Sequence, residues 1–315
     1  MPGIVALTGA TGFVGAAAAR HLAASGWRIR ALVRRMPQDA LMPGHELEIV
    51  LGDLDDRATL ERFVKGADAI VHSAGLVRAL TPIEFFQVNE GGTAHILEAA
   101  AKAAPRARFV HISSLAAREP QLSPYAASKQ AAEVKLAALA GERDWVALRP
   151  PAIYGPGDHE LLPLFKAAKL GLIAYPAEPD ARASAIHVAD LAAAIAALLQ
   201  QTDWRERIVE IDDEQEGGHD WAEIIQALGQ CFAKQPFALR LPRPLMAAIA
   251  AGVGMVSSLT GQPRVLSPSK IAELYHPDWV CHGPRLSGLA PWRPRFGLRE
   301  GFADTLAWYR SRALL

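Results

Sequence analysis

A short apolar run followed by a glycine-rich turn constrains the fold more than any other part of this sequence. Residues 3–8 (GIVALT) have the length and composition of a buried parallel strand, and an alanine-rich helical pattern occupies residues 16–24. The glycines between them suit a tight turn, a close approach of the backbone to a pyrophosphate, and close packing of helix on strand. The helix N-terminus also offers N–H groups and a partial positive charge to an anion. This strand, turn and helix predict a dinucleotide-binding site rather than an unrelated glycine-rich turn. The residues predicted to form the site are Gly9, Thr11, Gly12, Phe13, Val14 and Gly15.

Strand-like and helical segments alternate through the first 150 residues. Further strands are predicted at residues 27–33, 47–51, 69–72, 108–112 and 145–148, and helices at 56–65, 84–104 and 123–140. Ser123 is the expected cap of the last helix. This alternation predicts an α/β fold, a Rossmann-type doubly wound parallel sheet over residues 1–150. Ligands of such sheets bind at the carboxyl ends of the strands. The residues predicted at those ends are Gly9, Arg34, Asp53, Ala74, Ser114 and Pro150.

Three of these positions bear on the cofactor. Arg34, with Arg35 beside it, suits the 2′-phosphate of NADP, whereas NAD is the alternative if the two arginines are only solvated. Asp53, followed by Leu54, could accept a hydrogen bond from the adenine amino group. Its alternative role is a helix cap, for which Asp55 or Asp56 is better placed. Ala74 is small and leaves space for the cofactor.

A tyrosine and a lysine lie four residues apart in the predicted helix 123–140. Tyr125 and Lys129 therefore share one helix face. A tyrosine phenol has a reference pKa of about 10, too high for acid–base work at neutral pH. An ammonium group at roughly 5 Å favours the phenolate by about 3 kcal/mol at an effective dielectric constant near 20. We therefore predict that Tyr125 is a general acid–base group. Ser114 would hold a carbonyl oxygen, with Ser113 as a substitute.

The remaining residues, 151–315, predict a smaller substrate-binding lobe, some of whose strands and helices return to the first domain. Prolines recur here. Helices are expected at residues 160–170, 188–200, 221–232 and 301–315, and strands at 184–187 and 208–211.

Composition narrows the functional class. The 33 basic and 33 acidic side chains balance, which argues against a nucleic-acid binder. Cys231 and Cys281 lie far apart without metal-ligand spacing, so no metal site is expected and a reducing compartment is indicated. The first strand begins at residue 3, leaving no room for a signal peptide, and a cytoplasmic location is expected.

Residues 244–263 contain no charged side chain, and residues 245–259 are mostly apolar. We expect this stretch to pack in the second lobe or to line the substrate cleft, because glycine, serine and threonine dilute it. An interfacial helix and a membrane span are the alternatives, so contact with a membrane surface is not expected.

Together the motifs resemble an extended short-chain dehydrogenase/reductase, the group that includes NAD-dependent epimerase/dehydratases and 3β-hydroxysteroid dehydrogenase-like reductases. The matching stretches are TGATGFVG (8–15), GDLDD (52–56), HSAG (72–75), VNEGGTAHILEAA (88–100), ISS (112–114), YAASK (125–129), LRPPAIYGPGD (148–158) and IHVADLAAAI (186–195).

The resemblance implies NAD(P)(H) as cofactor and a catalytic set of Ser114, Tyr125 and Lys129, with a substrate cleft under the C-terminal lobe. It also implies that Lys129 holds the nicotinamide ribose, that Pro150 and Ile153 lie beside the nicotinamide, and that Asn89 supports the active-site loops. His187 and Asp190 match a structural motif.

One departure from the family concerns loop length. Eleven positions separate Ser114 from Tyr125, about half the separation in many members. Relatives with short loops include reductases of lipid-like ketones and the non-catalytic NADPH-binding accessory subunit of respiratory complex I. The leading hypothesis is an NADP(H)-dependent oxidoreductase that interconverts a ketone and a secondary alcohol on an apolar or lipid-like small molecule. The alternatives are an NAD-dependent sugar-nucleotide epimerase or dehydratase and a non-catalytic NADPH-binding module. A homodimer is the assembly considered.

Overall fold

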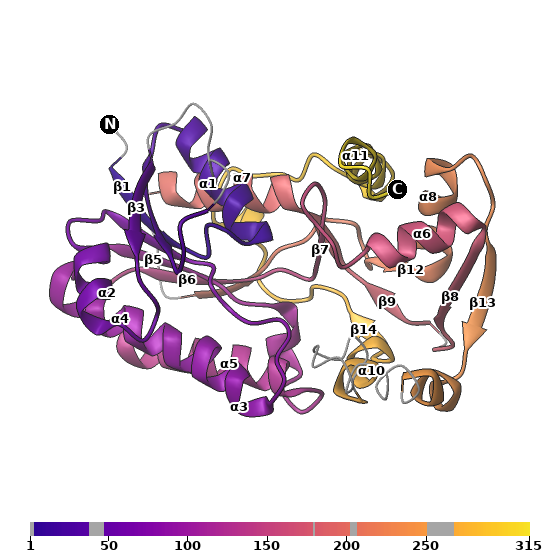
Figure 1. Ribbon diagram of the computed structural model, residues 1–315, viewed down its shortest axis with the longest axis horizontal. Helices are drawn as coiled ribbons and strands as arrows, with labels where there is room; N and C mark the ends of the chain where they lie inside the picture. Colours follow the sequence, from indigo (N-terminus) through magenta and orange to yellow (C-terminus); the bar gives the residue numbers. More distant parts are fainter. Residues whose placement is uncertain (1–2, 38–46, 179, 202–206, 251–267) are drawn as a thin grey trace. The chain divides into compact units, whose positions relative to one another are not determined.

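A computed structural model describes residues 3–37, 47–178, 180–201, 207–250 and 268–315 (Figure 1). The chain forms two compact units, each built from several segments. Unit 1 comprises Met1–Pro150, Ala189–Ile211 and Gly283–Arg293, and unit 2 comprises Pro151–Val188, Asp212–His282 and Pro294–Leu315.

Unit 1 is built on a parallel sheet of seven strands, which confirms the predicted doubly wound fold. Its strand order is β11-β6-β5-β4-β1-β2-β3. The order reverses direction between β1 and β4, the switch point where such sheets bind their ligands. The strands are β1 (Ile4–Thr8), β2 (Arg28–Val33), β3 (Leu47–Leu51), β4 (Ala69–His72), β5 (Arg108–Ile112), β6 (Trp145–Arg149) and β11 (Arg207–Glu210).

Helices cover both faces of this sheet. In Figure 1, α2, α4 and α5 lie along one face, and α1 and α7 lie on the other. The helices of unit 1 are α1 (Phe13–Ala24), α2 (Arg57–Val64), α3 (Pro82–Phe85), a π-helical turn η1 (Phe86–Gly91), α4 (Gly92–Ala103), the 3₁₀ turn η2 (Leu115–Arg118), α5 (Pro124–Leu139), α7 (Val188–Gln200) and the 3₁₀ turn η3 (Leu286–Gly288).

Helix caps fix where two of these helices begin. The Asp56 carboxylate accepts a hydrogen bond from the Thr59 N–H at 3.0 Å and caps α2. The Ser123 hydroxyl accepts one from the Ala126 N–H at 2.9 Å and caps α5, as predicted. Between sheet and helices, a continuous apolar cluster includes Phe63, Phe109 and Leu136, all fully buried.

Strand β11 pairs with β6 in parallel register, Val209 opposite Leu148. The strand predicted at residues 208–211 therefore completes the first sheet, and α7 belongs to that unit as well. A later segment also returns to it, because the Gly283 N–H donates to the Glu210 carboxylate at 2.8 Å and the Trp292 indole donates to the Asp190 carbonyl at 3.1 Å.

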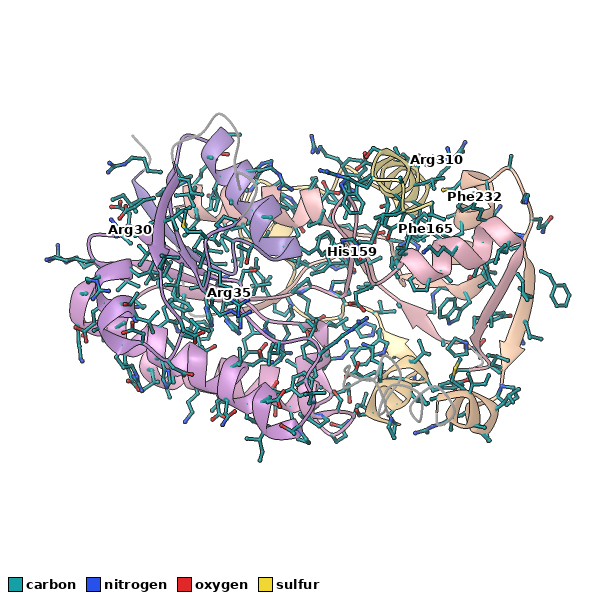
Figure 2. All side chains as sticks on the ribbon, viewed as in Figure 1. Arg30, Arg35, His159, Phe165, Phe232 and Arg310 are labelled. Atoms are coloured by element: carbon teal, nitrogen blue, oxygen red, sulfur yellow. The ribbon has the colours of Figure 1, made fainter. Side chains whose placement is uncertain are left out.

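Unit 2 contains short sheets packed with helices around aromatic side chains. The Phe165 ring packs edge-on against Phe302 and Tyr309, with ring centroids 5.5 and 5.2 Å apart. Its centroid lies 6.5 Å from that of Phe232, and Figure 2 shows these two residues close together. Pairs form between β7 and β10, between β8 and β13, and among β12, β9 and β14. The elements are β7 (Ala152–Tyr154), α6 (Leu162–Leu170), β8 (Leu172–Pro176), β9 (Arg182–Ala183), β10 (Ala185–His187), β12 (His219–Asp220), α8 (Trp221–Cys231), β13 (Phe237–Leu241), α10 (Pro268–Leu274), β14 (Asp278–Trp279) and α11 (Leu298–Ser311).

The apolar stretch 245–259 is only partly described. Residues 243–250 are helical, and residues 251–259 lie outside the described part of the chain. Among the described residues, none of the helices combines the length and the apolar character needed to cross a bilayer. In helix 243–250 the side chains of Met246 and Ala250 are buried, whereas Leu245 and Ile249 are exposed.

Candidate active site

The predicted site residues of unit 1 follow one edge of the sheet. All seven strands are parallel, so their carboxyl ends lie at the same edge. The strand order places Asp53 after β3, Arg34 after β2, Gly9 after β1, Ala74 after β4, Ser114 after β5 and Pro150 after β6. The edge therefore runs from the residues predicted at the adenosine end to those predicted at the nicotinamide end. The assignment of each residue to the cofactor stays a prediction.

The turn after β1 leaves the start of α1 open to a ligand. Gly12 occupies the N-cap position, where it provides no side-chain hydrogen bond, and the first turn of the helix carries no acidic residue. Gly9 has a positive φ of 76°, a conformation that favours glycine. A Cβ atom at Gly15 would overlap the Gly9 carbonyl, so the helix packs directly on the turn. Backbone N–H groups at this helix start suit a pyrophosphate.

Two arginines follow the carboxyl end of β2. Arg34 and Arg35 are exposed, and within the described residues neither has a hydrogen-bond or ion-pair partner. Arg30, earlier in the strand, is instead held by Glu48 at 2.8 Å and by the Lys65 carbonyl at 2.7 Å. Figure 2 shows Arg30 and Arg35 well apart. Arg34 and Arg35 are thus available to bind an anion from solvent.

The loop after β3 carries the residues predicted to meet the adenine. Asp53 is exposed, and its carboxylate accepts a hydrogen bond from the Asp55 N–H at 3.3 Å. Leu54 packs against the core beside Gly92. Because Asp56 is the cap of α2, Asp53 is not needed for that role.

Helix α5 presents Tyr125 and Lys129. The Tyr125 ring packs edge-on against Phe85, with ring centroids 6.1 Å apart. Lys129 is 5% exposed, and its Nζ donates to the Ile112 carbonyl at 2.7 Å. This bond ties α5 to the end of β5, two residues before Ser114. Burial lowers the pKa of Lys129 to about 8, against the opposing effect of Glu133.

Two buried histidines lie near Lys129 at the ends of β4 and β5. His72 and His111 stack with ring centroids 5.5 Å apart. Burial, with the nearby Lys129 charge, lowers the pKa of His72 to about 3 and that of His111 well below its ordinary value. His72 is held between the Thr8 hydroxyl at 2.7 Å and the Thr93 hydroxyl at 3.1 Å. Both rings are therefore neutral packing groups at physiological pH.

Asn89 lies in the π-helical turn η1 and joins three segments. Its Oδ1 accepts from the Leu76 N–H at 2.7 Å, and its Nδ2 donates to the Leu76 carbonyl at 3.1 Å and the Ser128 hydroxyl at 2.9 Å. The loop after β4, which carries Ala74, is thereby fixed to α5. Turns of this kind occur often at functional sites.

The structure distinguishes the two serines that follow β5. Ser113 is buried, and its hydroxyl donates to the Glu133 carboxylate at 2.6 Å. Ser114 is partly exposed, and its hydroxyl accepts from the Ala116 N–H at 3.2 Å. Ser113 is therefore engaged elsewhere and does not suit the role of substitute for Ser114.

Sequence reasoning missed Glu133 and Arg149. Arg149 forms a bidentate salt bridge with the buried Glu133. The Arg149 Nε and Nη2 atoms lie 2.8 and 2.5 Å from the two carboxylate oxygens of Glu133. Glu133 follows Lys129 by four residues, so the helical spacing that linked Tyr125 to Lys129 extends to Glu133. The pair fixes the inner face of α5 against β6.

Replacing Glu133 by alanine is expected to destabilise the fold by about 3 kcal/mol, because it leaves the Arg149 charge without its buried partner. Urea denaturation measures this loss. The exposed Glu61–Lys102 pair is the control, since Glu61→Ala should change the free energy of unfolding by about 0.5 kcal/mol at most. Equal effects of the two changes would contradict the assignment.

The last two predicted residues follow β6. The Pro150 carbonyl accepts a hydrogen bond from the Leu115 N–H at 2.8 Å, which joins the ends of β5 and β6. Ile153 lies in β7 of unit 2, opposite Ile186 of β10. Its predicted place beside the nicotinamide stays a prediction.

Known proteins with similar sequences and folds agree with this architecture. Residues 5–211 fit the model of the NAD dependent epimerase/dehydratase family. The chain is 42% identical to the ceramide reductase of Caulobacter vibrioides over 99% of this chain and 96% of the relative. It is 32% identical to the 2-alkyl-3-oxoalkanoate reductase of Stenotrophomonas maltophilia, over 50% and 53% of the two chains.

A solved structure, MoeE5 in complex with UDP-glucuronic acid and NAD, has the same fold. Its TM-score is 0.73 at 22% identity, covering 99% of this chain and all of that one. The family match covers most of the chain, and the full-length relative is a reductase. The protein is therefore a member of the NAD-dependent epimerase/dehydratase family, an extended short-chain dehydrogenase/reductase that acts as a nicotinamide-dinucleotide-dependent oxidoreductase on a small molecule.

Proposed function

We propose that this protein uses NADPH to reduce a ketone on a lipid of the ceramide class to the corresponding secondary alcohol. The observation that carries the proposal is the 42% identity to a ceramide reductase along nearly the whole of both chains. Tyr125 and Lys129, which the chemistry requires, lie one helical turn apart on α5, and the buried Lys129 is bonded to the end of β5.

The residues of unit 1 fit a nicotinamide dinucleotide. The start of α1 has no side-chain cap and the residues after β4 are small, so the backbone N–H groups of α1 are accessible to a ligand. When bound, this cofactor supplies a hydride to the carbonyl carbon. Tyr125 donates the proton that the carbonyl oxygen gains, and the Ser114 hydroxyl holds that oxygen. Lys129 stabilises the phenolate left behind and holds the nicotinamide ribose.

A direct assay tests whether a ketone of the ceramide class is the substrate. The purified protein is given NADPH and a ceramide whose secondary hydroxyl is replaced by a ketone, and both NADPH oxidation and formation of the alcohol are followed. We expect one alcohol formed for each NADPH oxidised. NADPH oxidation with other ketones alone would overturn the lipid assignment. Interconversion of nucleotide sugars without net NADPH oxidation would favour an epimerase, and tight NADPH binding without turnover of any ketone would favour an accessory module.

Cofactor choice is predicted to depend on Arg34, with Arg35 in support, because a guanidinium group can bind the 2′-phosphate of NADPH. A charge-assisted hydrogen bond contributes about 1.5–3 kcal/mol, so Arg34→Ala should weaken NADPH binding by roughly 10- to 150-fold. NADH binding should change little. Arg28→Ala is the control, because Arg28 is also exposed but lies at the opposite end of β2. Equal affinities of the wild type for both cofactors, measured by calorimetry, would contradict the prediction.

The pKa of Lys129 predicts the pH dependence of reduction. With a pKa of about 8, Lys129 is charged below that pH and loses its charge as the pH rises through it. Reduction should therefore slow above about pH 8, where the phenolate of Tyr125 loses its stabilising ammonium. The profile reports the coupled pair rather than one group. Lys129→Met should abolish this alkaline decline, and a wild-type rate that stays constant into the alkaline range would refute the prediction.

A further inference from the structure

Several large apolar side chains of unit 2 are exposed close to one another along the chain and in the fold. Leu170 is 84% exposed and Phe237 is 68% exposed, and four more are between 43% and 49% exposed. They come from the end of α6, from β8 and β13, and from helix 243–250. We call this set the apolar–basic surface, with the apolar members Leu170, Leu172, Phe237, Leu239, Leu245 and Ile249.

The pairing of β8 with β13 places three members of this surface on one face, together with Ala174. Phe237 lies opposite Leu172, and Leu239 lies opposite Ala174. Successive strand residues point to opposite faces, so these four side chains point away from Ile173, which is fully buried against the core of unit 2. Figure 1 shows β8 and β13 side by side, with α6 next to β8. The outer face of this sheet is thus apolar and exposed.

Helix 243–250 follows β13 directly in the chain. Leu241, the last residue of β13, packs with Met246, Ala250, Ile271 and Tyr275 in a separate buried cluster. This cluster anchors one stripe of the helix. The other stripe, formed by Leu245 and Ile249 at a spacing of four residues, is left exposed.

Basic residues predominate along the segments that form this surface, although Glu178 lies close to Tyr275 of the buried cluster beneath it. The chain is neutral overall, yet residues 161–177, 224–250 and 268–272 contain no aspartate or glutamate. The Lys234 ammonium donates to the Lys169 carbonyl at 3.2 Å, and Arg240 donates to the Tyr175 hydroxyl at 2.7 Å, so both lie at these strands. The exposed basic residues of these stretches include Lys166, Lys169, Lys234 and Arg243, whereas Arg240 pairs with Tyr175 on the opposite face of the sheet.

We propose that the apolar–basic surface docks this protein on an anionic lipid bilayer. Apolar side chains rimmed by lysine and arginine suit the boundary between acyl chains and acidic headgroups. A second copy of the chain fits less well, because a symmetric interface would bring these basic residues against their own like charges. Docking on a bilayer would not depend on the proposed reaction.

Co-sedimentation of the full-length protein with lipid vesicles tests the proposal. We expect binding to phosphatidylcholine vesicles that contain phosphatidylglycerol, and much weaker binding to phosphatidylcholine alone or at high salt. The double change Phe237→Ser with Leu239→Ser should lower the partition coefficient at least about tenfold. The double change Lys169→Gln with Arg243→Gln should lower it about 25-fold, since each basic residue near an anionic surface contributes roughly fivefold.

Two controls match these variants. Val134→Ser removes an apolar side chain that is 62% exposed on α5, and Arg20→Gln with Lys65→Gln removes two exposed charges from unit 1. Neither should change vesicle binding. All variants should keep the circular dichroism, NADPH affinity and reduction of a water-soluble ketone of the wild type, which separates this proposal from the proposed function. Absence of vesicle binding by the wild type, or equal loss in the controls, would overturn it. A wild-type dimer that Phe237→Ser with Leu239→Ser converts to a monomer would overturn it in favour of a second copy.

Discussion

Replacing Tyr125 by phenylalanine is expected to lower turnover about 10²- to 10⁴-fold, the usual contribution of a general acid. The change removes only the hydroxyl, so the packing of the ring against Phe85 and the affinity for NADPH should survive. Turnover of the lipid ketone and NADPH binding, measured on the same preparation, separate the two effects. A Tyr125→Phe enzyme with full activity would eliminate the mechanism.

Two further variants sharpen this test. Lys129→Met should reduce turnover at least as much as Tyr125→Phe and should also weaken NADPH binding. The reason is that Lys129 is proposed both to stabilise the Tyr125 phenolate and to hold the nicotinamide ribose. Ser114→Ala should reduce turnover without rescue by Ser113, whose hydroxyl is held by the buried Glu133. If Ser113→Ala rather than Ser114→Ala impaired turnover without loss of stability, the assignment of the two serines would be reversed.

Replacing Gly12 by valine is expected to abolish measurable NADPH binding while leaving the fold largely intact. A Cβ atom at Gly12 would meet only the Gly9 carbonyl oxygen, at 3.3 Å, and the backbone there has a φ of −86° that any residue adopts. The branched side chain would instead occupy the space assigned to the pyrophosphate. Calorimetry of NADPH binding and thermal unfolding of the same protein measure the two consequences.

Gly15→Ala provides the contrasting case. A Cβ atom there would overlap the Gly9 carbonyl and the Ala10 backbone, so this change should destabilise the fold itself. If Gly12→Val bound NADPH with unchanged affinity, the assignment of the turn to a dinucleotide would lose its basis.

Local signals in the sequence predicted much of unit 1. The strands ending at Thr8, Val33 and Leu51 were recognisable as short apolar runs, and Ser123 and Asp56 are caps with a local hydrogen-bond pattern. These features depend on neighbouring residues, so they can be read without the fold. The parallel arrangement then follows from the alternation of strands and helices.

The features that escaped prediction depend on distant residues. Pairing of β11 with β6 and of β13 with β8 joins segments about 60 residues apart, and no local pattern specifies the partner. Residues 237–241 do alternate Phe, Leu and Leu with Ala and Arg, a strand signal that was available. The different roles of Ser113 and Ser114 required the position of Glu133, since two adjacent serines have the same chemistry.

Unit 1 is assembled from separate segments of the chain, so parts of its sheet are synthesised much later than others. Strand β6 ends at residue 149, but its neighbour β11 begins at residue 207, and the segment that holds Glu210 begins at residue 283. At about 5–20 residues per second, the ribosome needs roughly 3–12 s to proceed from residue 149 to residue 210, where β11 ends. During this interval the outer edge of β6 lacks its partner and is open to pairing with another chain. A nascent chain stalled near residue 150 should therefore be more prone to aggregate than one stalled after residue 293.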